Sequence, residues 1–227
     1  MAVLSEEQTM LRDMAREWTQ NESPVGAFRK VRDAALPTGY DPQVYDELAQ
    51  MGWTGIVVPE AYGGTDFGWL SLGLVIEETA KTLTASPLAS SALAASALVA
   101  GGDEAIKAEW LPRLASGEAT GALAIDEGGR HDPEAIATTA RREGEGWVID
   151  GTKAFVHDAP GAALLIVAAR TDDGIALFAV PAIHRDRVGI ARAGDHGVDP
   201  MALAERPGLH DALVADADRR RIAPEAP

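Results

Sequence analysis

WVIDGTKAFV, residues 147–156, is the stretch that decides the fold class of the second half of the chain. Two runs rich in apolar and β-favouring residues flank the pair Asp150-Gly151. An Asp-Gly pair in this setting is a strong hairpin signal, because a type I′ turn requires positive φ at both central positions. The stretch therefore predicts an antiparallel hairpin, with strands over residues 147–149 and 152–156.

Further strands are predicted on both sides of this hairpin. Tight turns join several of them, including the turn at residues 171–174, and no helix alternates with them. Consecutive strands with short connections favour an antiparallel meander that closes into a barrel or a sandwich. The additional predicted strands are residues 120–125, 136–142, 164–169 and 175–180, with a loop over 198–205 and a final strand over 209–214.

The first half of the chain has helical patterns instead. Ser5, Asp41 and Asp103 are placed to cap three helices, because their side-chain oxygens can accept hydrogen bonds from free amides of the first turn. Residues 70–83 and 86–100 predict two buried helices, the second of them built from small residues. In the first helix, one apolar stripe is predicted from Met10, Leu11, Met14 and Trp18.

These patterns predict an α+β protein. An all-helical domain over residues 1–119 precedes an antiparallel β-barrel or β-sandwich domain over residues 120–215, and residues 216–227 form a frayed tail. The 227 residues provide enough chain for this arrangement.

Composition narrows the possible partners and the compartment. Lys and Arg total 20 and Asp and Glu total 35, which gives a net charge of −15 and disfavours nucleic acid and anionic membranes as partners. No cysteine is present, so thiol catalysis and cysteine-ligated metals are excluded. No apolar run reaches the length of a membrane span and the first residues do not resemble a signal peptide, so we expect a cytoplasmic protein.

Taken alone, the residues show no strong catalytic constellation. Asp126, Glu127, His131 and Asp132 cluster after a predicted strand and could ligate a divalent metal, although a solvated loop is the favoured interpretation. Phe155 in its predicted strand has the pattern of a core residue.

Several segments, in their order, resemble the acyl-CoA dehydrogenase family. They are the opening helix at residues 4–11, LAQMGWTGIVVPEAYGGTDFGWLSLGLVIEETAKTL (48–83), AIKAEWLPRLASGEATGALAIDE (105–127), ATTARREGEGWVIDGTKAFVHDA (137–159) and ALFAVPA (176–182). The resemblance implies a helical domain and a middle β domain of an enzyme that uses FAD to dehydrogenate the α,β bond of an acyl-CoA thioester.

The resemblance also implies a flavin site on two segments. In the family, one segment contains a Thr-Glu-Pro loop; aligned through residues 135–144, its threonine falls on Ile125 and its glutamate on Asp126, so the flavin contacts implied are Ala124, Ile125 and Asp126. Ile125 replaces a hydroxyl with a hydrocarbon.

A second segment resembles the family's Trp-Ile-Thr. It places Phe155 as an aromatic wall, with Val156 and His157 beside it. The same alignment implies that His131 and Asp132 meet the substrate, with His131 in place of a serine.

In the family the catalytic glutamate belongs to a C-terminal four-helix domain, and we expect that domain to lie outside this chain. None of Glu77, Glu78 and Glu127 matches the position of the base. The resemblance therefore implies a truncated or partner-dependent subunit in a homo- or hetero-oligomer, whose partner chain supplies the C-terminal helical domain. The alternatives are a non-enzymatic pseudo-subunit and a module that binds CoA esters without redox chemistry.

Overall fold

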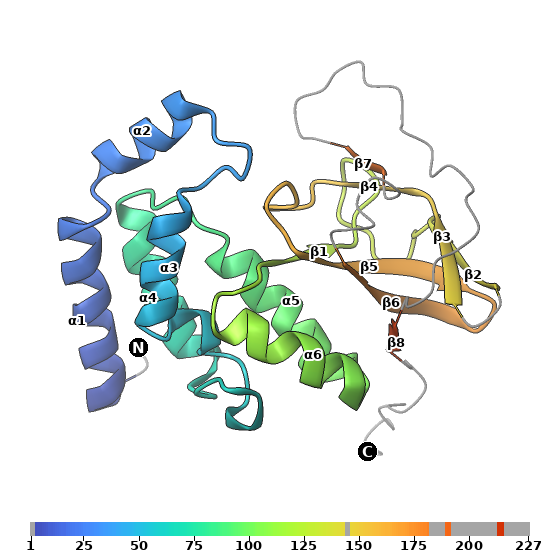
Figure 1. Ribbon diagram of the computed structural model, residues 1–227, viewed down its shortest axis with the longest axis horizontal. Coiled ribbons are helices and arrows are strands. Elements are labelled where there is room, and N and C mark those ends of the chain that lie inside the picture. Colours follow the sequence, from blue (N-terminus) through green and yellow to red (C-terminus); the bar gives the residue numbers. More distant parts are fainter. Residues whose placement is uncertain (1–2, 144–145, 182–188, 192–212, 216–227) are drawn as a thin grey trace, which may run out of the picture.

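The computed structural model describes residues 3–143, 146–181, 189–191 and 213–215. Helices fill the first half and strands the second, with α5 and α6 lying between the other helices and the sheet (Figure 1). The helices are α1 (Glu6–Asn21), α2 (Val25–Ala34), α3 (Pro42–Gln50), α4 (Gly68–Lys81), α5 (Leu88–Gly101) and α6 (Glu104–Ala115), with 3-10 turns η1 (Trp53–Gly55) and η2 (Glu60–Tyr62). None of the described helices is both long and apolar enough to cross a membrane.

The three predicted helix caps are confirmed. Ser5 and Gln8 form a reciprocal capping box at the start of α1. Asp41 accepts a hydrogen bond from the amide of Gln43 at 3.0 Å, and Asp103 accepts one from the amide of Ile106 at 2.9 Å. These contacts are local, which is why the sequence alone could predict them.

The predicted apolar stripe of α1 is only partly buried. Leu11 and Trp18 pack against the core of the helical domain. Met10 and Met14 are 65% and 51% exposed, because α4 covers a neighbouring arc of the helix. Periodicity identified an apolar face wider than the surface that α4 covers.

The sheet is mixed and open, so the prediction of a closed antiparallel barrel or sandwich is wrong. Its order is β3-β2-β5-β6-β8, with β1 also on β5, and β1–β5, β2–β5 and the separate β4–β7 pair are parallel. Tight turns between neighbouring strands do not determine how distant strands pair. The strands are β1 (Gly121–Ala124), β2 (Thr139–Glu143), β3 (Gly146–Asp150), β4 (Thr152–Ala154), β5 (Leu164–Thr171), β6 (Gly174–Pro181), β7 (Gly189–Ala191) and β8 (Leu213–Ala215).

The hairpin predicted at Asp150-Gly151 is also wrong. β3 pairs with β2, and β4 leaves the sheet to pair with β7, so Gly151 is a corner between two sheets. Gly151 has φ +152°, and a Cβ there would lie 2.4 Å from Thr138 Oγ1. The glycine is therefore required by a close tertiary approach rather than by a two-residue turn.

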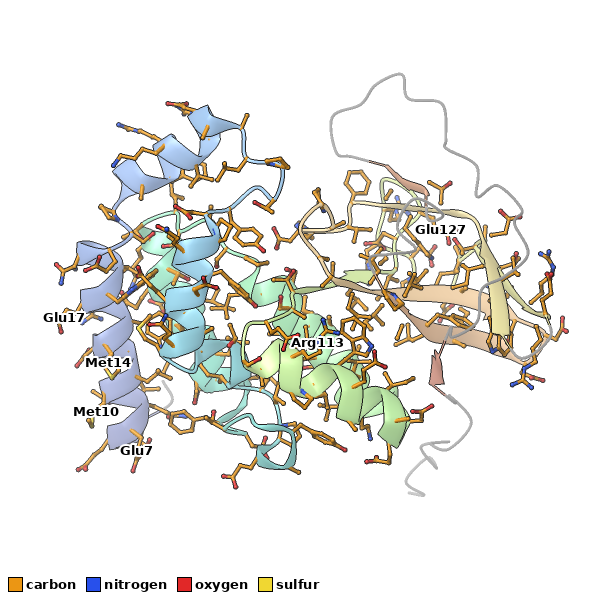
Figure 2. All side chains as sticks on the ribbon, in the orientation of Figure 1. Glu7, Met10, Met14, Glu17, Arg113 and Glu127 are labelled. Atoms are coloured by element: carbon orange, nitrogen blue, oxygen red, sulfur yellow. The ribbon has the colours of Figure 1, made fainter. Side chains whose placement is uncertain are left out.

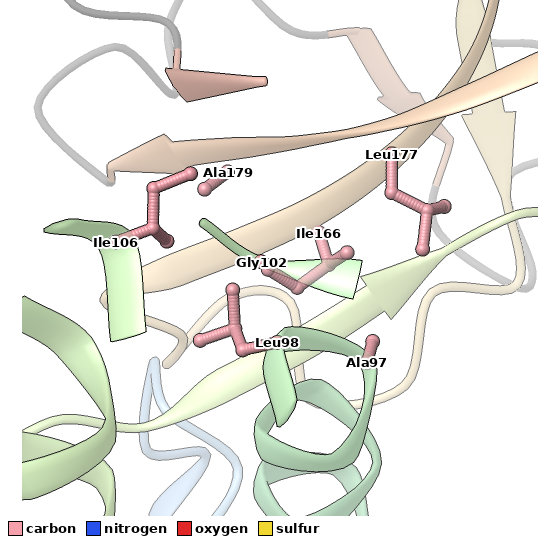
Figure 3. A pocket seen from close by; sticks show the side chains of 7 residues that line it. All are labelled: Ala97, Leu98, Gly102, Ile106, Ile166, Leu177 and Ala179. Carbon is pink, nitrogen blue, oxygen red and sulfur yellow. The ribbon is translucent and has the colours of Figure 1, made fainter. Parts of the chain in front are cut away.

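One core joins the helices to the sheet. Leu98, Leu111 and Leu114 of α5 and α6 pack in a single cluster with Leu164 and Ile166 of β5. Between these layers lies a small apolar hollow without charged side chains in its lining (Figure 3). The central strand β5 is buried throughout its first six residues, which fits a strand covered on both faces.

The far C-terminal predictions lie mostly outside the described residues. This applies to the loop over 198–205, to the tail over 216–227 and to the start of the final strand predicted over 209–214. β8 coincides with the end of that predicted strand.

Candidate functional site

Two segments predicted to form one site lie side by side in the structure. The amide of Ala154 donates to the carbonyl oxygen of Asp126 at 2.7 Å. Lys153 Nζ donates to the carbonyl oxygen of Ile125 at 2.9 Å. The end of β1 and the end of β4 therefore form one edge of the β domain, with Ala124, Ile125 and Asp126 next to Phe155, Val156 and His157.

A buried ion pair holds this edge together. Lys153 is 1% exposed, and its Nζ lies 2.6 Å from Glu127 Oε1. The other carboxylate oxygen of Glu127 accepts from the amide of Ala137 at 2.6 Å, and Oε1 also accepts from the amide of Thr138 at 2.9 Å. Figure 2 shows Glu127 within the β domain. The carboxylate thus ties the loop after β1 to both β4 and the residues before β2.

The electrostatics of the pair favour a charged carboxylate. Burial alone would raise the pKa of Glu127, but hydrogen bonds from Lys153, Thr138 and Ala137 outweigh it and lower the pKa to about 2. Burial lowers the pKa of Lys153, opposed by the hydrogen bond and charge of Glu127. A carboxylate held in this way is a weak base.

Phe155 is not a core residue. Its side chain is 52% exposed, and its backbone has φ +54°, in the left-handed region that residues other than glycine rarely adopt. The strand predicted over residues 152–156 is therefore shorter in the structure, because β4 stops at Ala154. An exposed aromatic in a strained backbone conformation is a recurrent feature of binding sites.

The two residues after Phe155 differ in their environments. Val156 packs against the core of the β domain, and His157 is exposed. Asp158 turns away toward the helical domain, where its carboxylate accepts a hydrogen bond from Ser90 at 2.6 Å. Of Val156, His157 and Asp158, His157 is therefore the residue whose side chain is available to a ligand.

The predicted substrate residues lie on the exposed loop after Glu127. His131 Nδ1 lies 2.8 Å from Asp126 Oδ1, which links this loop to the predicted flavin segment. Asp132 is exposed, and its carbonyl accepts from the amide of Ala135. Within the described part of the chain, no three His, Asp or Glu side chains are grouped as a metal site, and Glu127 is engaged by Lys153.

Lys153 belongs to this edge, although the motifs of the sequence do not single it out. A lysine inside an otherwise apolar strand was a usable signal, because a buried lysine requires an anionic partner. The sequence suggests Glu127 as a metal ligand, and its pairing with Lys153 joins residues that are 26 positions apart in the chain.

Comparisons with known proteins agree with this architecture. The family model for the acyl-CoA dehydrogenase N-terminal domain matches residues 5–118, and that for the middle domain matches residues 122–206. Acyl-CoA dehydrogenase FadE12 of Mycobacterium tuberculosis is 32% identical over 186 residues, covering 78% of this chain and 47% of the relative. Mitochondrial isovaleryl-CoA dehydrogenase of Pongo abelii is 32% identical over 217 residues, covering 94% of this chain and 50% of the relative.

Solved structures give the same result. The Tcur3481–Tcur3483 steroid ACAD G363A variant superposes with a TM-score of 0.71 at 33% identity, covering 78% of this chain and 48% of that chain. The ChsE4–ChsE5 complex of Mycobacterium tuberculosis has a TM-score of 0.71 at 26% identity, covering 80% and 49%. This chain belongs to the acyl-CoA dehydrogenase family, and it spans about half the length of the curated relatives it matches.

Proposed function

We propose that this chain forms the helical and middle domains of an FAD-dependent acyl-CoA dehydrogenase. The observation that carries the proposal is Phe155, an exposed ring in a left-handed conformation beside the loop at Ile125. Relatives are named as acyl-CoA dehydrogenases, and a related glutaryl-CoA dehydrogenase structure from Mycobacterium smegmatis contains FADH2.

The residues at this edge fit one face of a flavin. Phe155 provides an aromatic surface, and the ring of His157 provides a nitrogen that can donate a hydrogen bond. Ile125 provides only hydrocarbon and backbone groups, and Lys153 already engages its carbonyl. FAD, when bound, supplies the acceptor for the hydride, while these residues orient its ring and exclude water.

The substrate side of the proposal rests on the loop that carries His131 and Asp132. The contact between His131 and Asp126 connects this loop to the proposed flavin edge. In our proposal His131 meets the polar part of the CoA ester where a serine stands in the family pattern.

The base is proposed to come from outside the described residues. Glu78 is buried but paired with Arg16 at 2.9 Å and Lys81 at 3.0 Å, and Glu127 is paired with Lys153. Burial raises the pKa of Glu78, but the hydrogen bonds from both cations outweigh it and the pKa is lowered. A carboxylate stabilised in its charged form is poorly suited to removing a substrate proton.

Exposed apolar side chains on the helical domain support a partner domain. Trp69 and Leu70 in α4 are 51% and 50% exposed, and Leu93 in α5 is 47% exposed. Large apolar side chains left in contact with water are a common feature of surfaces that another domain covers. We propose that they contact a C-terminal helical domain, supplied by a further part of the protein or by a partner subunit.

The proposal is tested by co-expressing the chain with the product of the adjacent gene and measuring flavin absorbance and acyl-CoA oxidation. We expect close to one FAD per catalytic unit and loss of flavin on Phe155→Ala. A complex that stays colourless and inactive with every acyl-CoA tried would reject the proposal.

Ile125 favours one alternative, a pseudo-subunit without redox activity. A hydrocarbon at this position removes a side-chain hydrogen bond to a flavin. This alternative predicts a colourless chain, alone and in mixtures, so bound FAD near one per chain rejects it. Isothermal titration with acyl-CoAs in the absence of FAD tests whether CoA-ester binding remains.

A further inference from the structure

The outer face of α1 carries a row of exposed side chains that the proposed function does not use. Met10 and Met14 are 65% and 51% exposed, and Glu7 and Glu17 are exposed beyond them. Figure 2 shows the four side chains along the outer edge of α1, at the end of the molecule farthest from the β domain. We call these four residues the α1 seam.

The spacing of the seam is that of a helix–helix contact. Positions 7, 10, 14 and 17 follow intervals of three, four and three residues. This alternation places side chains in one line along a helix, as in the a and d positions of a coiled coil. Val3 lies before the N-cap Ser5, outside the helix, and is 96% exposed. The seam can therefore receive a helix laid along α1.

The charges of the seam restrict that helix. No ion pair within the described residues uses Glu7 or Glu17, whereas both arginines of α1 are paired with carboxylates, Arg12 with Asp13 and Arg16 with Asp13 and Glu78. Among the described residues, the seam thus carries negative charge without a cationic partner at both ends, with methionines between. Ten residues separate the two carboxylates, a distance of about 15 Å along a helix.

We propose that the α1 seam docks a basic amphipathic helix of another protein. The partner helix carries Lys or Arg opposite Glu7 and Glu17 and apolar residues opposite Met10 and Met14. Methionine suits such a site because its flexible thioether adapts to different apolar side chains. This proposal does not depend on flavin binding or on dehydrogenase activity.

A second copy of α1 does not satisfy the seam. Antiparallel pairing sets Glu7 of one copy against Glu17 of the other, and parallel pairing sets each glutamate against its equivalent. Both arrangements bring like charges together without a cation between them. Charge complementarity therefore selects a basic helix of a different sequence.

The test uses two synthetic peptides and the full chain. The first peptide is an amphipathic helix with leucines at its seam positions and two lysines ten residues apart, and the second is a scramble of the same composition. Binding is measured by fluorescence anisotropy at physiological and high salt. We expect the first peptide to bind at least about tenfold more tightly than the scramble, with affinity falling as salt rises.

Matched variants locate the binding. Glu7→Gln with Glu17→Gln is compared with Glu60→Gln with Glu109→Gln, two exposed glutamates that change the net charge equally. Met10→Ser with Met14→Ser tests the apolar centre, and circular dichroism checks that each variant remains folded. We expect about tenfold weaker binding for both seam variants and no change for the control pair.

A second readout does not depend on mutation. Bound peptide should slow oxidation of Met10 and Met14 by peroxide relative to Met51, followed by mass spectrometry of fragments. Three results overturn the proposal: equal binding of the scramble, equal weakening by the control pair, or self-association of the chain that the seam variants abolish.

Discussion

Lys153 Nζ lies 2.6 Å from Glu127 Oε1, and the lysine side chain is 1% exposed. The same ammonium donates to the carbonyl of Ile125 at 2.9 Å, so one buried charge fixes both the side chain and the backbone of the loop after β1. The stability of this edge therefore depends on the pair remaining complete.

Removing one partner should cost more than removing both. Glu127→Gln leaves the Lys153 charge buried without an anion, and we expect a loss of about 3 to 5 kcal/mol in unfolding free energy. The double variant Glu127→Gln with Lys153→Met removes the buried charge and should recover part of that loss. Urea unfolding of the three proteins measures the difference; an equal or larger loss in the double variant would contradict a charge-based cause.

Acid should destabilise the fold through Glu127. Its pKa is about 2 in the folded chain against an ordinary value of 4.5, so the unfolded chain binds more protons between these values. The stabilisation is therefore fully present above about pH 5 and is lost as the pH falls toward 2, by at most about 3 kcal/mol. Urea midpoints across this range measure the slope. Glu127→Gln should flatten it, and an unchanged slope would assign the effect to other carboxylates such as Glu78.

Replacing Phe155 should affect binding without weakening the core. Glycine accepts φ +54° freely and the ring is half exposed, so we expect Phe155→Gly to change the unfolding free energy by less than about 1 kcal/mol. Phe178→Ala is the comparison, because Phe178 is fully buried and its loss should cost about 3 to 5 kcal/mol. Thermal or urea unfolding separates the two, and similar losses would show that Phe155 contributes to the core after all.

Gly151→Ala should be more harmful than Gly174→Ala. A Cβ at Gly151 would lie 2.4 Å from Thr138 Oγ1, whereas one at Gly174 would meet nothing within 4 Å, and both positions have positive φ. We expect the backbone alone to cost about 1 to 2 kcal/mol at Gly174 and the clash to add at least about 1 kcal/mol at Gly151. Equal losses in urea unfolding would show that the corner at Gly151 relaxes easily.

Local features were predictable from the sequence, and distant pairings were not. The caps at Ser5, Asp41 and Asp103 were predicted because each one depends on residues within one helical turn. The prediction of a hairpin at Asp150-Gly151 is wrong because the local turn preference competes with the close contact between Gly151 and Thr138. The sequence does not reveal that contact. Strand pairing is generally decided by such tertiary contacts.

The candidate site divides in the same way. The family resemblance placed residues 124–126 and 155–157 in one site, and the structure brings these two segments together. The buried position of Lys153 and the exposed ring of Phe155 depend on how β4 leaves the main sheet, which no local pattern indicates.

The shared cluster of α5, α6 and β5 has a consequence for how the chain folds as it leaves the ribosome. β1 pairs with β5 some 40 residues later, at Gly121 against Leu164, and the apolar faces of α5 and α6 rest on β5 and β6. The helical domain therefore emerges with one face uncovered, and the face stays uncovered until β5 and β6 have also left the ribosome. During that interval the nascent chain exposes apolar surface. Chaperones bind such surface, and chains that expose it aggregate when chaperones are scarce.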